Sequence, residues 1–185
     1  MHEKKPREQA AEELLAGAEE ALDQLHSQLC LHLSADAISP VAKIPYKARI
    51  LKEALLHRVW ELGSSCHGEF AAKRVIPAFT LARAVLETAC IVFTLKQQVR
   101  TAVDANRLGD LDASFLMRAM FGRRDDPSLL YQAINILTTI DHVDAYIAHE
   151  VKTSKGGLRK HFESVCEFVH PNWAGVSGAY TKDID

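Results

Sequence analysis

The sequence has no excess of charge of either sign, because 22 lysines and arginines stand against 24 aspartates and glutamates. The net charge of −2 excludes the global basic field of many nucleic-acid-binding proteins, although a local RNA site stays open. The N-terminus, MHEKKPREQAAEELL, lacks the apolar core of a secretory signal. We therefore expect a soluble, cytoplasmic protein.

Paired cysteines are also missing. Cys30, Cys66, Cys90 and Cys166 lie far apart in largely apolar, helical contexts, and no CxxC motif occurs. Disulfides stay open, but this pattern favours buried free thiols in a reducing compartment.

The sequence lacks the short motifs that mark common catalytic and cofactor sites. It contains no HExxH, no GxSxG and no glycine-rich loop that could cradle a phosphate. His57 with Glu61, and the acidic and histidine residues of 141–149, could bind a metal across two helices, but solvated helix faces explain them as well. We expect neither a metal nor a cofactor.

The most apolar segment spans residues 75–95, where 15 of 21 residues are apolar. Arg83 and Glu87 lie in its middle. A charge at the centre of a membrane costs roughly 2.5–3.5 kcal/mol on the most lenient scale. We therefore interpret the segment as the core helix of a soluble bundle and expect no membrane contact.

Apolar residues recur at helical spacing along most of the chain, and no stretch alternates as a strand would. The pattern predicts an all-α, up-and-down bundle of about five to six helices in a single domain, 1–185. A loop is expected over 34–46, and the second helix is expected to continue past Gly63 and Gly68. Helix 1 could close the core or pair with its copy in a homodimer. The expected helices cover about 6–33, 46–73, 75–104, 108–121, 128–152 and 157–170.

The segment 75–104 carries a narrow polar stripe. At 100° per residue, Thr80, Arg83, Glu87 and Thr94 fall within about 60° of one another, and Thr88 lies off this stripe. Either the stripe faces solvent, or it is an internal seam in which Arg83 pairs with Glu87 and reaches another helix. The Arg-then-Glu order is the weaker one for surface pairing and tilts the interpretation towards a partner elsewhere.

A second candidate lies where the last helix stops. Pro171 disfavours helical conformation at His170, so the helix is expected to end there. His170 would be either a helix cap or an oriented imidazole at a pocket edge, able to transfer protons or bind an anion. Asn172 follows directly as a candidate ligand-binding residue, together with Thr80.

Basic residues form three small clusters, which lie within 47–52, 118–124 and 152–160. Such clusters are more often solvated faces than nucleic-acid footprints. They do not by themselves predict an RNA partner.

Two runs, LARAVLETA (81–89) and EFVHPN (167–172), resemble the DUF5677 family of uncharacterised bacterial proteins, which is loosely similar to HEPN domains. The resemblance covers about residues 46–175 and implies an all-helical fold. A HEPN-like domain would imply a metal-independent ribonuclease or a toxin-type enzyme. The usual spacing of Arg and His on one helix is absent, so a catalytic site would have to join Arg83 and Glu87 to His170 across helices.

Three functions follow as expectations. The first is a helical structural or interaction module, expected as a homodimer, with a polar Arg–Glu–His site. The alternatives are the ribonuclease or toxin-type enzyme and a small-ligand-binding module.

Overall fold

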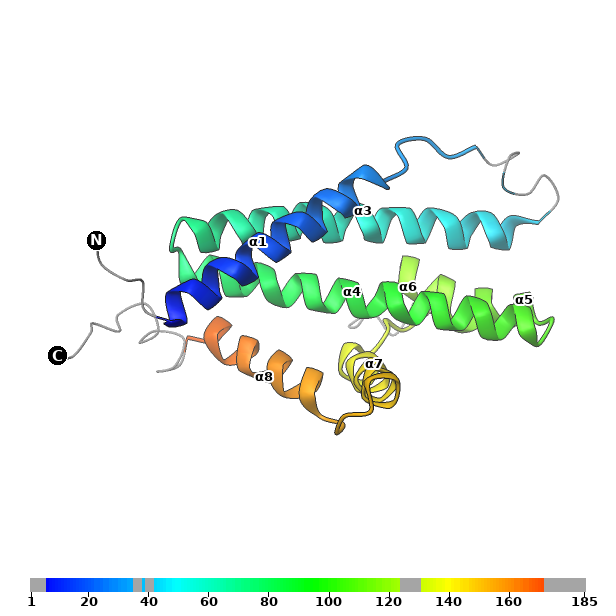
Figure 1. The fold of residues 1–185 in the computed structure, drawn as a ribbon. Helices are drawn as coiled ribbons and strands as arrows, with labels where there is room; N and C mark the ends of the chain where they lie inside the picture. Colours follow the sequence, from blue (N-terminus) through cyan, green and yellow to red (C-terminus); the bar gives the residue numbers. More distant parts are fainter. Residues whose placement is uncertain (1–5, 35–37, 39–41, 124–130, 172–185) are drawn as a thin grey trace.

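The computed structural model describes residues 6–34, 38, 42–123 and 131–171, and within them it is an all-α bundle, as predicted. Two long helices, α3 (Lys43–Ala71) and α4 (Val75–Asp104), lie side by side along its length (Figure 1). The first helix, α1 (Pro6–Ser27), crosses α3, and the last, α8 (Gly157–Val169), follows α4. Helix α7 (Ile136–Val151), which precedes α8 in the chain, is seen roughly along its axis in this view and contacts both α4 and α8.

Helix α4 is shared by two cores. On one side Leu95 and Ala102 pack with Leu51 of α3 and with Phe115 and Leu116. On the other side Cys90 packs with buried residues of α7 and α8, namely Ile140, Val143 and Phe162. The bounds of α4 confirm the predicted segment 75–104.

The second long helix does continue through its glycines. A Cβ at Gly63 would lie only 2.6 Å from Leu22 Cδ2, so glycine allows α1 to approach α3 closely at this point. The helix ends at Ala71, two residues before Lys73, which has a left-handed backbone (φ 58°). Arg74 then pairs with Glu69 across the turn into α4.

Three predicted bounds were wrong. Helix α3 begins at Lys43, inside the loop that was expected over 34–46. Helix α1 ends at Ser27 rather than near residue 33, because the chain turns there and Gln28 N–H donates to the Leu25 carbonyl. Helix α7 begins at Ile136 rather than Ser128, because the Asn135 side chain caps it by accepting from the Leu137 and Thr138 amides at 3.0 and 3.3 Å. Residues 131–135 are not helical.

The predicted helix over 108–121 is present, but it is not uniform. It comprises α5 (Leu108–Leu111), a π-helical turn, η1 (Asp112–Leu116), and α6 (Met117–Phe121). The π turn holds the buried residues Phe115 and Leu116, and Lys47 of α3 binds its first residue, Asp112, at 2.8 Å. This ion pair links the start of α3 to the start of the π turn.

Candidate functional site

Arg83 and Glu87 form the ion pair that their spacing predicts. Arg83 Nε lies 3.0 Å from Glu87 Oε1, and the two side chains are 36% and 30% exposed. The Arg83 guanidinium also lies over the ring of Phe162 on α8, 5.8 Å from its centroid. Arg83 thus does reach a second helix, and its pair with Glu87 lies in a half-buried seam between α4 and α8.

Cys166 of α8 borders the same seam. Burial raises the pKa of its thiol, the Arg83 charge lowers it, and the Glu87 charge raises it. Cys166 also packs against the buried cluster of Cys90, Ile140, Val143 and Phe162.

His170 lies at the end of α8, as predicted. It has extended backbone (φ −75°, ψ 144°), its N–H donates to the Cys166 carbonyl at 3.1 Å, and its side chain is exposed. Helices α4 and α8 run antiparallel, because Phe162 contacts Arg83 whereas Phe168 stacks on Phe79 with ring centroids 4.4 Å apart. This register carries His170 towards the first turn of α4, away from Arg83.

Thr80 and Asn172 were the candidate ligand-binding residues. Thr80 is exposed, and its hydroxyl donates to the Ile76 carbonyl of its own helix at 2.9 Å. Asn172 lies outside the described residues. The catalytic role of Arg83, Glu87 and His170, and the binding role of these two residues, stay predictions.

The residue left off the stripe is the buried one. Thr88 is 4% exposed, its hydroxyl donates to the Ala84 carbonyl at 2.7 Å, and it accepts from Arg58 Nε of α3 at 3.3 Å. Its angular offset from the stripe was the signal that it faces α3 rather than α8.

Asp144, one of the carboxylates considered for a metal site, instead caps α8 from the neighbouring helix. Its two oxygens accept from the Gly156 amide at 2.5 Å and the Leu158 amide at 2.6 Å, and the residue is 7% exposed. These backbone bonds, above all the one from Gly156, lower the pKa of the Asp144 carboxyl against the effect of desolvation.

Within the described residues no group of three or more His, Cys, Asp or Glu side chains is arranged to hold a metal. The chain contains one Glu-x-x-His spacing, Glu167 to His170, whereas a di-iron bundle uses this spacing on two helices. The ring of His57 lies 3.2 Å from the Cys30 carbonyl.

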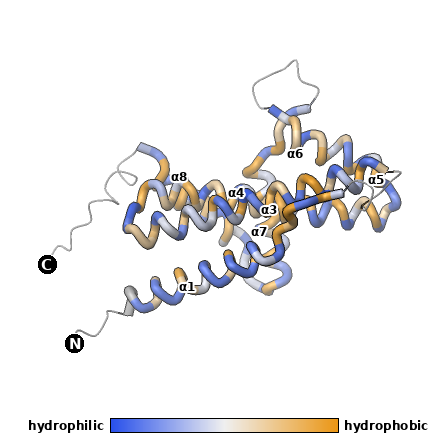
Figure 2. Tube along the Cα trace, turned by 90° about the horizontal axis from the view of Figure 1, so that it is seen from above, coloured by the Kyte–Doolittle hydropathy of each residue, from blue (hydrophilic) through white to orange (hydrophobic). Residues whose placement is uncertain are grey.

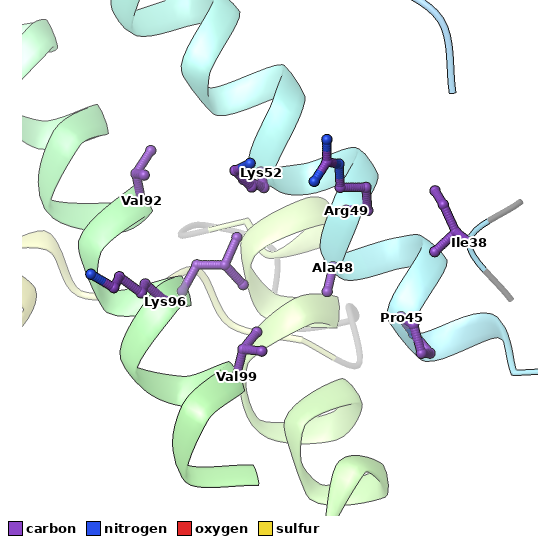
Figure 3. A pocket seen from close by; sticks show the side chains of 9 residues that line it. Ile38, Pro45, Ala48, Arg49, Lys52, Val92, Lys96 and Val99 are labelled. Carbon is purple, nitrogen blue, oxygen red and sulfur yellow. The ribbon is translucent and has the colours of Figure 1, made fainter. Parts of the chain in front are cut away.

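A groove lies between α3 and α4, far along the bundle from His170. Its volume is about 490 Å³, and its lining is apolar apart from Arg49, Lys52 and Lys96, whose side chains are seen in the close view (Figure 3). The apolar lining comprises Ile38, Pro45, Ala48, Val92, Leu95 and Val99. Every charged residue that lines the groove is a cation.

The buried carboxylate of Glu53 holds two of these cations at the rim. Arg49 Nε and Lys52 Nζ lie 2.9 and 3.2 Å from Glu53 Oε1, while both basic side chains stay 44% exposed. Among the described residues Glu53 Oε2 has no hydrogen-bond partner. One carboxylate thus positions two cations, and Lys96 adds a third from α4, so the rim keeps a positive charge.

A second hollow of about 260 Å³ continues the groove along α4. It is lined by Leu56, Val59, Ala89 and Phe93 and shares Val92 and Lys96 with the first. Sequence reasoning missed this surface, because it assigned Arg49 and Lys52 to a solvated face and α4 to a covered core. The signal in the sequence was that α4 is apolar on most of its faces. The neighbouring helices cover only some of these faces.

Helix α4 is also the described helix that is long and apolar enough to cross a membrane by length and composition, which is weak evidence because the core helix of a soluble protein has the same properties.

The chain matches no family model, no curated protein and no solved structure. The resemblance to DUF5677 and HEPN proteins stays a prediction that rests on residues 81–89 and 167–172.

Proposed function

We propose that the chain is a helical interaction module whose α3–α4 groove binds an amphipathic helix with acidic flanks. The observation that carries the proposal is the groove itself, which combines an apolar floor with a rim whose charged residues, Arg49, Lys52 and Lys96, are all cationic. Apolar grooves of this kind bind the apolar face of a helix through residues spaced by three or four.

The shape of the groove favours a helix over a compact small molecule. The two hollows share Val92 and Lys96 and follow α4 from Ala89 to Val99. This stretch of α4 is about 15 Å long, which matches nearly three turns of a docked helix. The first hollow alone is within the roughly 300–1,000 Å³ of small-ligand sites, so an anionic amphiphile is the alternative that the experiment must test.

In this proposal Arg83 and Glu87 hold α8 against α4 and take no part in chemistry. The Arg83 guanidinium pairs with Glu87 and lies over the ring of Phe162, so both of its interactions are within the seam. The four cysteines are free thiols, which supports a reducing, cytoplasmic location.

The test is a titration of the full chain into a fluorescently labelled synthetic helix with leucines at helical spacing and glutamate flanks, followed by anisotropy. The matched peptide carries lysine in place of glutamate. We expect the acidic peptide to bind and the basic one not to. Lys96→Glu should weaken binding about tenfold or more, because it places like charges together at the rim.

Lys160→Glu on α8 is the matched control, since Lys160 is exposed and lies outside both hollows. It should leave binding unchanged. Equal binding of both peptides, or an unchanged affinity in Lys96→Glu, would overturn the proposal. Lys96-dependent binding of dodecanoate without binding of the acidic peptide would replace it with the small-ligand alternative.

A further inference from the structure

The N-terminal half of α1 lies mostly at the surface of the molecule. From residue 9 to residue 21 every residue except Leu15 is exposed, and Leu14 is 76% exposed. Figure 2 shows this half of α1 running away from the other helices towards the N-terminus. A single exposed leucine is common on protein surfaces, so the charge around Leu14 is what distinguishes this half of α1.

The charge of α1 is opposite to that of the groove. The segment Pro6–Ser27 carries six acidic residues and one arginine. The groove is lined by Arg49, Lys52 and Lys96 and by no acidic residue. An acidic helix with an exposed apolar residue is the kind of partner for which the groove is proposed above.

The groove and the exposed half of α1 in one molecule lie too far apart to meet. Leu22 covers Gly63, His26 stacks on Trp60 at 4.2 Å, and the Cys30 carbonyl lies 3.2 Å from the His57 ring. These contacts run α1 antiparallel to α3, so residues 9–21 point towards the Ala71 end of α3 (Figure 1). The first hollow lies beside residues 45–52, at the other end.

We propose that the groove of one molecule binds α1 of a second copy of the same chain. This inference rests on the proposed function, because it names the acidic helix that the groove binds. Each copy offers one groove and one exposed α1, so a two-fold axis can pair both at once and close the assembly as a homodimer. The apolar contact is made by Leu14, and the glutamates of α1 meet the lysines of the rim.

A charge exchange tests the pairing with the full chain. One variant carries Lys52→Glu and Lys96→Glu, which makes the groove acidic while keeping Arg49 on the buried Glu53. The other carries Glu13→Lys and Glu20→Lys, which lie seven residues apart on one face of α1. Circular dichroism confirms that each variant is folded before its mass is measured by light scattering across a concentration series.

We expect the wild type to form a dimer and each variant alone to need about tenfold or more higher concentration to do so. An equimolar mixture should restore the dimer, because both of its contacts again join opposite charges. A wild type that stays monomeric at the highest concentration, or a mixture that pairs no better than the separate variants, would overturn the inference.

A second pair of variants keeps the test decisive if the charge changes affect folding. Leu14→Asp should abolish the dimer, whereas Val151→Asp, at an equally accessible residue (67% exposed) of α7, should not. Equal dimerisation of the two would contradict the inference.

The same Leu14→Asp chain, whose groove is intact, separates the two proposals when it is titrated into the acidic peptide. Peptide binding by this chain, together with a wild type that stays monomeric, would reject the second copy and keep the docking function. A failure of this chain to bind the peptide would reject the docking function itself.

Discussion

The two sides of α4 are made of similar apolar residues but are covered very differently. Towards α7 and α8, Cys90 is 4% exposed and Phe162 is 3% exposed within a closed cluster. Towards α3, Leu95 is buried in the other core, but Val92 and Lys96 beside it border open hollows. The closed side owes its closure to α8, a helix of 13 residues that is held by specific contacts at both ends.

Those contacts are polar at one end and aromatic at the other. Asp144 caps the first turn of α8, and Phe168 stacks on Phe79 near the last. A helix this short is marginal in isolation, so its position depends on such anchors. The comparison teaches that one helix can be covered by anchored neighbours on one face and still border an open groove on another.

Removing the aromatic side chain at the centre of the closed side should have the largest effect. We expect Phe162→Ala to lower the free energy of unfolding by about 3–5 kcal/mol, because it leaves a cavity in a well-packed cluster. Val92→Ala on the open side should cost no more than about 1 kcal/mol. Urea denaturation followed by circular dichroism measures both, and equal losses would contradict the contrast.

The Asp144 cap of α8 should make the stability of the protein depend on pH in the acidic range. The folded-state pKa of Asp144 is lowered, so its stabilisation is present above the unfolded value of about 3.9 and is lost as pH falls through the folded value. We expect Asp144→Asn to unfold more easily than the wild type at neutral pH, with the difference shrinking below about pH 4.

The matched control for the cap is Asp141→Asn. Asp141 lies on α7, as Asp144 does, and binds Arg159 of α8 at 2.9 Å, but it is 54% exposed. Denaturation midpoints of both variants between neutral pH and pH 3 measure the effect. A difference from the wild type that stays constant over this range would argue against the carboxylate cap.

The ion pair between Arg83 and Glu87 should contribute little to the free energy of unfolding, although it lies in the middle of α4. Glu87→Ala is expected to cost within about 1 kcal/mol, because both side chains are about one-third exposed and solvent screens the pair. Glu163→Ala, which breaks the more exposed pair with Arg159, is the control. A loss of several kcal/mol for Glu87→Ala alone would show that Arg83 is buried in solution.

The smallest effect on the monomer is expected at the exposed half of α1. Leu14→Ala should change the free energy of unfolding by no more than about 0.5 kcal/mol in dilute solution, because the side chain is 76% exposed. Leu22→Ala should cost more, since Leu22 covers Gly63 on α3. Equal costs would mean that the whole of α1 packs on its own bundle.

Much of the fold was predictable because the spacing of apolar residues within a segment indicates a helix. The bounds of α4 followed from apolar spacing with Pro77 in the first turn, and the continuation of α3 past Gly63 followed from the absence of an intervening proline. The start of α7 did not, because Leu129, Leu130 and Ile134 continue the helical spacing, whereas the described residues 131–135 are not helical. The cap at Asn135 was a local signal that spacing alone did not reveal.

The candidate site was predictable only in part, for the same reason. The bond between Arg83 and Glu87 joins neighbouring turns of one helix, so their spacing predicts it. The partner on α8, Phe162, depends on the register of two helices that lie far apart in the sequence. The same holds for the groove, whose cations come from both α3 and α4, and of which Arg49 and Lys52 had been assigned to a solvated face.

The sequence by itself determined most of the helical segments, which face of each is apolar and where Arg83 meets Glu87, because these properties repeat with the turn of a single helix. The tertiary structure alone decided that Asp144 caps α8, that His170 lies towards the start of α4, and that the α3–α4 face stays open. These outcomes depend on crossing and register between separate helices, and spacing within one helix carries no information about either.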